Sequence, residues 1–353
     1  MPELSVVICS LNGAPGVARA LRSLHGQLPP GALEAVVVDD GSTDDTAAVA
    51  AEGGAVVVRH PVNRGLAAAR NSGVAAATAP VVAFIDDDCE ARPGWARGIL
   101  AGYDAPDVAG VGGPVHVGGG DGFVLGYLRR HNPLQQLEME LARGDAPALR
   151  LWLYLRRQWT EPVRPDRREV FALVGASMSF RREVLEETGG FDERFRFGAE
   201  ELELCHRVRR LPGARRLVVD GGAAVTHHFA PSLGDTLRRS RSYGRGAARF
   251  RAAWPSVSPT VFPAPLVAAG LALLAVRRPW ARVAAVIAPQ LMLPSGLRAA
   301  VRERNPAALL DAYVELMQEA ASDWGFARGW WEFRDLEPAV DAAPAAPVAE
   351  AVR

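Results

Sequence analysis

The chain has 353 residues, of which 49% are hydrophobic and 23% are charged, and its formal net charge is zero. This length suits two domains, or one large domain with an appendage, and the apolar fraction can form a substantial core. A balanced charge gives no strong positive field, so we expect no nucleic-acid partner. The forty basic residues are all arginine, which makes arginine abundance alone weak evidence for phosphate binding.

Cysteine usage and the N-terminus bear on the compartment. Cys9, Cys89 and Cys205 are scattered along the chain without the spacing of metal ligands, a pattern typical of a reducing, cytosolic environment. The N-terminus runs directly into an apolar segment and has neither a charged lead nor a cleavable apolar stretch, so we expect no secretory signal. The prediction is a cytoplasmic protein.

Strands and helices alternate through the N-terminal part of the chain. The predicted strands are Leu4–Cys9, Ala35–Val38, Ala55–Arg59 and Pro80–Ile85. The predicted helices are Val17–His25, a helix capped by Ser42 or Thr43 that runs to about Ala51, and Gly65–Ala77. This alternation indicates parallel βαβ units with right-handed crossovers. Ligands of such sheets bind at the carboxyl ends of the strands, which here carry Ser10–Asn12, Asp39–Ser42 and Asp86–Asp88.

The acid triplet Asp86–Asp88 directly follows the apolar run Ala79–Ile85. Three carboxylates this close repel one another unless a cation lies among them, and oxygen ligands favour Mg²⁺ or Mn²⁺. The alternative for an isolated triplet is a solvated acidic turn. A second acid pair, Asp39-Asp40, follows the apolar strand Ala35–Val38. Two acid-terminated strands at one sheet edge favour a site for a metal and a nucleotide.

Several motifs carry a family resemblance. In chain order they are Val38–Asp44 (VDDGSTD), Asn63–Leu66 (NRGL), Ala69–Gly73 (ARNSG), Phe84–Asp88 (FIDDD), Gly189–Phe195 (GGFDERF) and Glu200–Cys205 (EELELC). With this order and spacing, the region from about residue 4 to 245 resembles inverting family-2 glycosyltransferases of the nucleotide-diphospho-sugar transferase superfamily. The resemblance implies the GT-A fold, a Rossmann-like, mostly parallel α/β sheet with helices on both faces.

The resemblance also implies roles for individual residues. The residues expected to bind the nucleotide sugar are Ser10, Asn12, Asp39, Asp40, Asn63, Arg70, Asp86, Asp87 and Arg245. Asp39 and Asp40 are expected to bind the base and the ribose, and Arg70 is expected to contact the diphosphate. Asp88 is expected to hold Mg²⁺ or Mn²⁺, with Asp86 near the ribose and the metal and with His227 as a further ligand. The alternatives are helix capping for Asp40 and structural roles for Asn63 and His227.

The acceptor side needs a general base. Glu200-Glu201 stands where the family carries a Glu-Asp pair whose Asp deprotonates the acceptor hydroxyl, so Glu201 is the expected base and Glu200 the alternative. A glutamate can accept the same proton if its backbone lies farther from the acceptor hydroxyl by the length of one methylene group. The other interpretation is an acidic helix N-terminus that complements the helix dipole. Ser177, where relatives commonly have Asn, is a second departure from the family pattern.

The chain changes character after Asp235. Residues 236–302 contain eleven arginines and no acidic residue, and six of the arginines lie in Arg238–Arg251. The apolar runs Val261–Val276 and Val283–Leu293 are shorter than the roughly 18 residues typical of a membrane span. We expect an interfacial or re-entrant helix pair held against anionic lipid; the alternative is a packed helical subdomain. Leu309, Tyr313, Leu316, Met317, Ala320 and Trp324 predict one face of an amphipathic helix.

These observations lead to one domain scheme and one function. Residues 1–235 form the catalytic domain, with a nucleotide-sugar half at 1–115 and an acceptor half at 116–235. Residues 236–335 form a helical, membrane-associated region, and 336–353 a disordered tail. The predicted function is metal-dependent, inverting transfer of a hexose-type sugar from a nucleotide-diphosphate sugar to a hydroxyl of a glycan or a lipid-linked acceptor. We expect this in cell-envelope, polysaccharide or glycolipid synthesis, at the inner face of the membrane.

Two other functions compete with this prediction. A scaffold that binds nucleotide sugar without catalysis is suggested by the departures at Glu201 and Ser177, but the intact acid triplet argues against it. A Rossmann dehydrogenase would also have an acid near residue 39. The first turn, Ser10–Gly16, lacks the G-x-G-x-x-G pattern, and a dehydrogenase has no use for the triplet.

Overall fold

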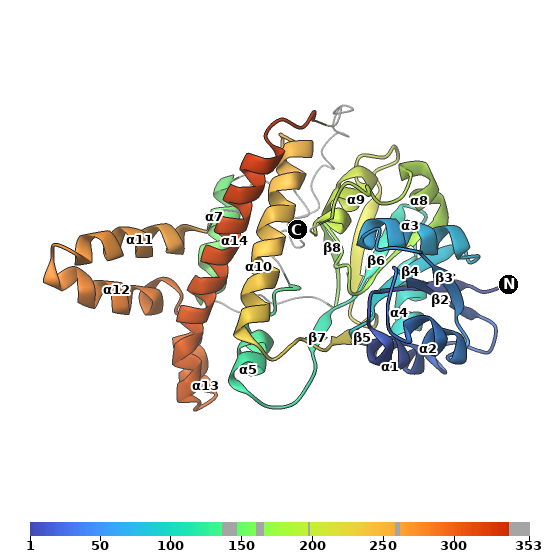
Figure 1. The fold of residues 1–353 in the computed structure, drawn as a ribbon, viewed down its shortest axis with the longest axis horizontal. Helices are drawn as coiled ribbons and strands as arrows, with labels where there is room; N and C mark the ends of the chain where they lie inside the picture. The colour runs from blue at the N-terminus through green and yellow to red at the C-terminus, as the bar shows by residue number, and fades with distance from the viewer. Residues whose placement is uncertain (136–146, 160–165, 197, 258–261, 339–353) are drawn as a thin grey trace.

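The structure, a computed structural model, describes residues 1–135, 147–159, 166–196, 198–257 and 262–338. Figure 1 shows an α/β part that carries the N-terminus beside a helical part, from which a two-helix hairpin projects on the far side. Of the predicted disordered tail, residues 339–353 lie outside the described residues.

An eight-stranded mixed sheet forms the centre of the α/β part. Its order is β3 (Val56–Arg59), β2 (Leu33–Asp39), β1 (Leu4–Ser10), β4 (Val81–Asp86), β9 (Met178–Arg181), β6 (Val108–Gly112), β10 (Arg216–Asp220) and β8 (Arg167–Val170). The four strands of the N-terminal half are mutually parallel, whereas β9 is antiparallel to both of its neighbours and β8 is antiparallel to β10. The prediction of an α/β, mostly parallel sheet is therefore confirmed.

Apolar alternation places this sheet between two helical layers. Val6 and Ile8 of β1 enter one core cluster and Val7 enters the other, because successive side chains of a strand point to opposite faces. The helices α1 (Ala14–Leu24), α2 (Thr46–Glu52) and α3 (Leu66–Ala76) lie within a few residues of the predicted helices, and α1 begins three residues before the predicted Val17.

The start of α2 differs from the prediction. This helix begins after Asp45 rather than after Ser42 or Thr43. The reason is that the backbone N–H of Ser42 is bound by Asp39, and the Ser42 hydroxyl accepts a hydrogen bond from the N–H of Asn12. Ser42 therefore fixes a loop between the first two strands and caps no helix.

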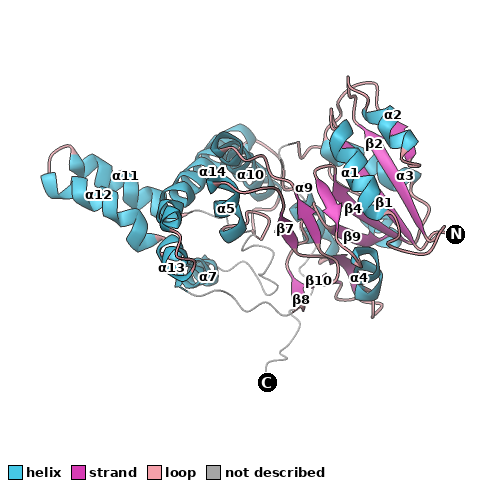
Figure 2. Cartoon of the chain, turned by 90° about the horizontal axis from the view of Figure 1, so that it is seen from below, coloured by secondary structure: helices cyan, strands magenta, loops and turns pink. Residues whose placement is uncertain are grey.

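A second, three-stranded sheet lies at the edge of the main sheet. Strand β11 (Val225–His227) runs between β5 (Cys89–Ala91) and β7 (Val115–Val117). The register of β11 on β5 sets His227 opposite Cys89. Since β5 follows the acid triplet directly, this pairing brings residue 227 to the end of β4. Figure 2 shows β7 at the boundary between the α/β and helical parts.

The helical part is built around two long helices. These are α10 (Leu233–Ala253) and α14 (Asp311–Phe333), which lie side by side in Figure 1. Glycines allow a close approach: a Cβ on Gly244 would lie 1.9 Å from the carbonyl oxygen of Ser322, and one on Gly325 would lie 2.1 Å from that of Arg241. The other helical elements are α5 (Phe123–Arg130), α7 (Pro147–Trp159), α11 (Pro263–Ala275), α12 (Pro279–Met292), α13 (Ser295–Arg302) and the 3-10 turn Pro306–Leu310.

Part of the apolar face predicted for α14 turns outward. Met317 and Trp324 of that face are 40% and 63% exposed. The buried face instead carries Asp311, Glu315 and Glu319. Their partners come from α5 and α7: Arg130 donates a hydrogen bond of 2.6 Å to Asp311, and the Tyr154 hydroxyl donates one of 3.1 Å to Glu319. Periodicity correctly predicts the helix but not which face is covered, since buried carboxylates are tolerated when they are paired.

Among the described helices, none by itself has the length and apolar character needed to cross a membrane. α12 and α13 meet those criteria only when they are taken together, and they are bent by 70° at the break between them.

Candidate active site

Parallel pairing brings the predicted site residues to one edge of the sheet. In the strand registers Ser10 is opposite Asp39, and Cys9 is opposite Asp86. The ends of β1, β2 and β4 therefore carry their polar residues side by side, as the sequence predicts. The three acids after β4 nevertheless take three different positions.

Asp87 turns back into the protein. Its Oδ2 accepts a hydrogen bond of 2.5 Å from the Ser10 hydroxyl. The loop after β1 closes over it, since a Cβ on Gly13 would lie 2.1 Å from the same oxygen. Burial raises the pKa of Asp87 to about 6, although the hydrogen bond from Ser10 opposes this shift. Ser10 and Asp87, both predicted to bind the nucleotide sugar, instead bind each other and fix the loop.

Asp88 meets His227. Oδ1 of Asp88 is 3.3 Å from Nε2 of His227. The two residues and Cys89 place one possible ligand atom each within 4.8 Å of one another. This is the grouping that a divalent metal needs, and it contains two of the three predicted metal ligands.

The protonation states of the three side chains indicate which of them can bind a metal. Burial, together with the charge of Asp86, raises the pKa of Asp88 to about 7. Burial lowers the pKa of His227 to about 4, so its imidazole is neutral and can donate a lone pair. Burial raises the pKa of Cys89 far above its usual range. A neutral thiol is a poor partner for Mg²⁺ or Mn²⁺; Cys89 instead lies 3.8 Å from Oδ1 of Asp88 and orients it.

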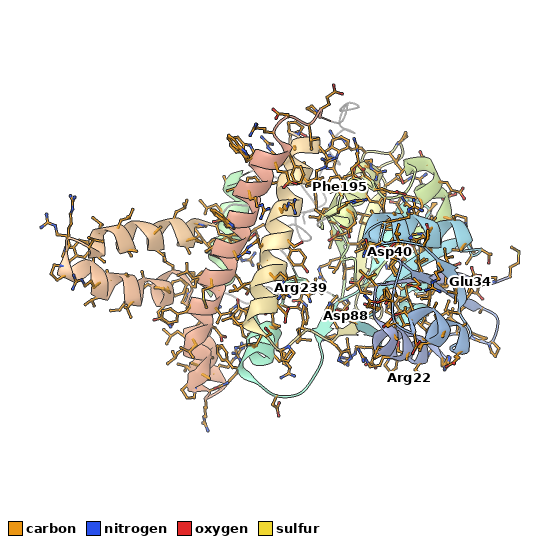
Figure 3. All side chains as sticks on the ribbon, viewed as in Figure 1. Arg22, Glu34, Asp40, Asp88, Phe195 and Arg239 are labelled. Carbon is orange, nitrogen blue, oxygen red and sulfur yellow. The ribbon has the colours of Figure 1, made fainter. Side chains whose placement is uncertain are left out.

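Arg239 is a site residue that sequence reasoning missed. It comes from α10, and one guanidinium nitrogen lies 3.4 Å from Nε2 of His227. Its guanidinium lies 4.9 Å from the ring centre of Phe229, which itself stacks on His227 at 4.0 Å. Burial opposes its charge, but Tyr243, Asp88 and Asp86 raise its pKa. Figure 3 shows Asp88 and Arg239 between the sheet edge and α10.

Arg245, which the resemblance includes among the residues expected to bind the nucleotide sugar, is paired elsewhere. Its guanidinium pairs with Glu332 at 2.5 Å, on α14. The cluster of arginines on α10 is visible in the sequence, but the face of the helix that meets the site is not. Six residues are not a whole number of turns at about 3.6 residues per turn, so Arg239 and Arg245 cannot point the same way.

Asp86 is paired with a buried arginine. Arg70 is 3% exposed and lies between two carboxylates, 3.3 Å from Asp86 and 2.6 Å from Glu200. Burial opposes its charge, but Glu200 and Asp86 raise the pKa of Arg70. The predicted contact of Arg70 with a diphosphate stays a prediction, because two carboxylates pair with its guanidinium in this geometry. The guanidinium instead joins the end of β4 to the first turn of α9 (Glu200–Val208).

Glu201 differs from Glu200. No hydrogen bond or ion pair joins its carboxylate to another side chain in the described part of the chain. Burial and the neighbouring Glu200 raise the pKa of Glu201 to about 8, while Arg70 opposes the shift. Because Glu200 is tied to Arg70, the geometry favours Glu201 as the residue available for proton transfer.

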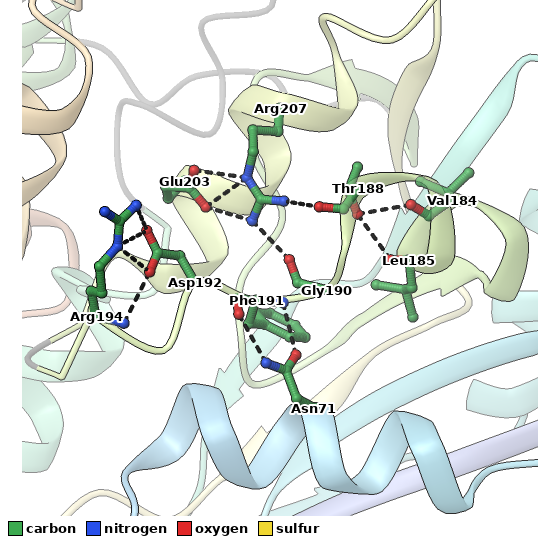
Figure 4. Close-up of polar contacts among 10 residues, drawn as sticks. All are labelled: Asn71, Val184, Leu185, Thr188, Gly190, Phe191, Asp192, Arg194, Glu203 and Arg207. Atoms are coloured by element: carbon green, nitrogen blue, oxygen red, sulfur yellow. Dashed lines mark hydrogen bonds and ion pairs between the residues drawn. The ribbon is translucent and has the colours of Figure 1, made fainter. Parts of the chain in front are cut away.

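The segment before α9 is anchored on both sides. Figure 4 shows the side-chain amide of Asn71 exchanging two hydrogen bonds with the backbone of Phe191, at 2.9 and 2.8 Å. From the other side Arg207 donates to the carbonyl oxygens of Thr188 and Gly190, and it is paired with Glu203 at 2.6 Å. These contacts hold the start of α9 against α3. Asn71 is thus structural.

The two acids after β2, Asp39 and Asp40, also differ in their contacts. Asp39 is fully buried, and its Oδ1 accepts from the N–H of Ser42 at 2.7 Å. Its Oδ2 is buried without a hydrogen-bond partner, with Arg59 at 3.3 Å. An unsatisfied carboxylate oxygen at a ligand-binding edge suits an N–H donor of a base.

Both carboxylate oxygens of Asp40 accept hydrogen bonds from other parts of the protein. One oxygen accepts from His60 at 2.6 Å and from the N–H of Arg64 at 2.9 Å, and the other accepts from the N–H of Gly65 at 2.9 Å. These last two amides lie at the start of α3. The prediction that Asp40 holds the nucleotide is replaced by helix capping, the alternative weighed for this residue, although the helix is α3 rather than α2.

The two predicted asparagines have no common role. Asn12 binds the N–H and hydroxyl of Thr43, at 2.8 and 3.1 Å, and so joins the loops after β1 and β2. Asn63 is exposed beside Gly41, where an added Cβ would lie 2.7 Å from its backbone nitrogen. Gly41, with φ of +85°, therefore allows the chain to fold back at this edge.

Comparison with known proteins agrees with this architecture. Residues 5–189 match the family described as Glycosyl transferase family 2, and residues 150–300 match Glycosyl transferase family group 2. Among solved structures, a mannosyltransferase from Pyrobaculum calidifontis, in complex with GDP-Man and Mn²⁺, aligns with a TM-score of 0.54 at 19% identity. The alignment covers 94% of this chain and 88% of that one. The likeness is one of fold, and it supports the predicted GT-A architecture.

Two curated relatives illustrate the sequence similarity. The pre-mycofactocin glycosyltransferase of Mycobacterium tuberculosis is 32% identical over 277 residues, which are 77% of this chain and 52% of that protein. The glucosyl-dolichyl phosphate glucuronosyltransferase of Haloferax volcanii is 29% identical over 238 residues, 64% of this chain and 69% of that protein. The chain thus spans about half the length of the mycobacterial relative.

Proposed function

Because this chain belongs to glycosyl transferase family 2, we propose that it transfers a hexose-type sugar from a nucleotide-diphosphate sugar to an acceptor hydroxyl. The reaction is metal-dependent and inverts the anomeric carbon. The observation that carries the proposal is the meeting of Asp88 and His227 at 3.3 Å, at the sheet edge that also holds Asp39. Two segments about 140 positions apart in the chain supply this pair, and the pairing of β11 with β5 brings them together.

The donor atoms fit Mg²⁺ or Mn²⁺. Asp88 offers a carboxylate oxygen, and His227 offers a neutral ring nitrogen, since burial lowers its pKa to about 4. The other ring nitrogen, Nδ1, is buried without a hydrogen-bond partner, whereas Nε2 faces the Arg239 guanidinium at 3.4 Å; because arginine only donates, Nε2 carries the lone pair that would bind the metal. A bound divalent cation supplies charge neutralisation of the diphosphate as it leaves. Asp86 pairs with Arg70 through one oxygen at 3.3 Å, so Asp88 and His227 are the ligands that we propose.

The donor is held at three points. The Oδ2 of Asp39, which makes no hydrogen bond and has Arg59 at 3.3 Å, accepts an N–H of the base. Asp86 lies at the end of β4 with its side chain 34% exposed, where it can accept ribose hydroxyls. Arg239 faces Asp88 and His227 from α10 and presents its charge to the diphosphate oxygens. A site preorganised in this way stabilises the negative charge that grows on the leaving group.

The proposed chemical step forms one bond, breaks one bond and transfers one proton. The acceptor oxygen bonds to the anomeric carbon as the bond from that carbon to the diphosphate oxygen breaks, and the hydroxyl proton passes to the Glu201 carboxylate. A carboxylate whose pKa is raised to about 8 is a stronger base than an ordinary glutamate and suits this transfer. Glu200 neutralises Arg70 and so keeps the guanidinium from pairing with Glu201.

The acceptor is a glycan or a lipid-linked sugar of the cell envelope, and the protein works at the inner face of the membrane. The relative from Haloferax volcanii, named for a dolichyl phosphate acceptor, supports a lipid-linked class. The exposed apolar helices of the C-terminal part support the location.

A donor screen tests the proposal. Thermal shift with a panel of nucleotide sugars and Mn²⁺ should pick out one donor, and that donor should lose its sugar slowly to water in the absence of acceptor. Stabilisation by a nucleotide sugar with no hydrolysis or transfer under any condition would favour the non-catalytic binding protein instead.

A further inference from the structure

The hairpin of α11 and α12 leaves most of its apolar surface uncovered. In α11 only Ala264 is buried, and in α12 only Ala281 and Pro289. The large apolar residues that are exposed on the hairpin are Leu266, Val267, Leu273, Leu274, Val276, Trp280, Val283, Val286, Ile287 and Leu291. Figure 1 shows the hairpin projecting from α14 away from the α/β part. A helix that is apolar on most sides is stable when something apolar surrounds it.

The neighbouring elements continue this apolar surface. α14 turns Met317 and Trp324 outward, and the Tyr313 hydroxyl, on the same face, bonds to the carbonyl oxygen of Val286 in the hairpin. The outward face of α14 is therefore the one that meets the hairpin. α13 adds exposed Leu297 and Val301. The exposed apolar surface thus extends over α11, α12, α13 and α14.

The charge pattern identifies what covers this surface. Residues 262–302 contain five arginines, at 277, 278, 282, 298 and 302, and no acidic residue. Three of them lie at the tip of the hairpin around the exposed Trp280. Arginine and tryptophan beside apolar side chains are typical of segments at an interface between lipid and water. Cations without acids are complementary to anionic headgroups.

We propose that the α11–α12 hairpin, together with the outward face of α14, inserts into the interfacial layer of an anionic membrane. At about 1.5 Å per residue, the 13 residues of α11 extend about 20 Å, less than the hydrocarbon core of about 30 Å. Arginines at the tip oppose a perpendicular entry, because their charges would reach the middle of the bilayer. The hairpin therefore lies along the surface, its apolar side chains among the upper acyl chains and its guanidinium groups at the phosphates.

This placement restricts the predicted membrane-binding surface to a part of residues 236–302. The arginines of α10 are not part of the membrane surface as a group, because α10 is packed against α14 and Arg239 and Arg245 are engaged inside the protein. The inference does not depend on the catalytic proposal, since a vesicle-binding assay reads no glycosyl transfer.

Flotation of the full chain with vesicles tests the charge. Phosphatidylglycerol vesicles should bind the protein and phosphatidylcholine vesicles should bind it far less. Arg277→Glu/Arg278→Glu should lower partitioning into phosphatidylglycerol on the order of 30-fold, from about fivefold for each cation near an anionic surface. The matched control is Arg22→Glu/Arg97→Glu, two exposed arginines of the α/β part, which should change partitioning little. Equal loss in both variants would overturn the assignment to the hairpin.

A second pair of variants tests insertion. Leu273→Gln/Val283→Gln should weaken partitioning on the order of tenfold or more at high salt, where screening leaves the apolar contribution. Val56→Gln/Val62→Gln, exposed apolar residues of the α/β part, should not. Circular dichroism checks that all variants fold.

Two other outcomes would refute the proposal. One is a wild-type protein that binds no vesicles but forms a dimer which Leu273→Gln/Val283→Gln dissociates; this would assign the hairpin to a second copy of the chain. The other is a hairpin tip that becomes accessible to protease only from the opposite side of sealed vesicles; this would show a spanning segment.

Discussion

Arg70 donates a hydrogen bond of 2.6 Å to Glu200 across 130 positions of the chain. The same guanidinium reaches Asp86 at 3.3 Å, so one buried cation ties the donor edge of the sheet to the helix that carries the proposed base. The donor and acceptor halves of the site are therefore coupled through a single side chain.

Removing this cation should cost stability. Arg70→Met leaves Glu200, 3% exposed, as a buried charge without a partner, and we expect a loss of about 3–5 kcal/mol in the free energy of unfolding. Arg64→Ala is the control, because the Arg64–Glu193 pair is 3.4 Å long and nearly half exposed on both sides, and its loss should change stability by less than about 1 kcal/mol. Urea denaturation measures both. Similar values for the two variants would mean that the Arg70 pair carries no special weight.

Glu201→Gln separates binding from chemistry. The amide keeps the shape of the side chain but accepts no proton, so turnover should fall by roughly two to four orders of magnitude while donor affinity stays close to wild type. Glu200→Gln should lose less. If Glu200→Gln is the inactive variant and Glu201→Gln is active, the base is assigned to the wrong residue.

The pH profile gives an independent reading of the same residue. Glu201 acts as a base only when it is deprotonated, and its pKa is raised to about 8. Activity should therefore rise with pH up to about 8 and then level off. Since the charge of Glu200 contributes to raising this pKa, Glu200→Gln should move the rising limb to lower pH. A limb that does not move in Glu200→Gln, measured as kcat/KM against pH, would contradict the coupling.

The acid pair after β2 offers a matched comparison. Asp39→Asn should weaken donor binding about tenfold or more, because the oxygen that makes no hydrogen bond is the one assigned to the base. Asp40→Asn should instead lower the melting temperature with little change in donor affinity, since the oxygens of Asp40 hold His60 and the start of α3. Isothermal titration and thermal melts of both variants decide this. The reverse pattern would restore the sequence-based role of Asp40.

Arg239 and its neighbour Arg238 test the diphosphate contact. Arg239→Met should lower affinity for a nucleoside diphosphate roughly 10- to 100-fold, the range of a charge-assisted hydrogen bond, and should affect a nucleoside much less. Arg238 is 77% exposed and paired with Asp235 within its own helix, so Arg238→Met should behave as wild type. Loss of nucleoside binding to the same extent would indicate a structural role for Arg239.

Sequence patterns predict the sheet edge well but not the partners of each residue. Apolar runs followed by polar residues place Ser10, Asp39 and Asp86 at one edge, because the pairing of parallel strands leaves little freedom. Whether a carboxylate faces a ligand or a loop depends on contacts from distant segments. Asp87 is taken by Ser10, and Asp40 by His60 and two amides, and no local pattern predicts either.

Helix faces are the second limit of prediction. The arginine cluster of α10 is plain in the sequence, yet Arg239 rather than Arg245 meets the site, because the docking of α10 on α14 sets its rotation. The outward apolar residues of α14 have a similar cause: Arg130 pairs with Asp311, and the Tyr154 hydroxyl donates a hydrogen bond to Glu319, so the acidic side can be buried. Polar partners on other elements therefore invert a burial pattern that periodicity alone would assign the other way.

The most direct test of the central claim is Mn²⁺-dependent binding of a nucleoside diphosphate, measured by isothermal titration calorimetry with Mn²⁺ and with EDTA. Wild-type protein should bind more tightly with Mn²⁺, Asp88→Asn should lose that difference while keeping its fold, and Asp87→Asn should keep the difference, since Asp87 is hydrogen-bonded to Ser10. A full Mn²⁺ effect in Asp88→Asn would contradict the assignment of the metal and diphosphate to Asp88 and His227.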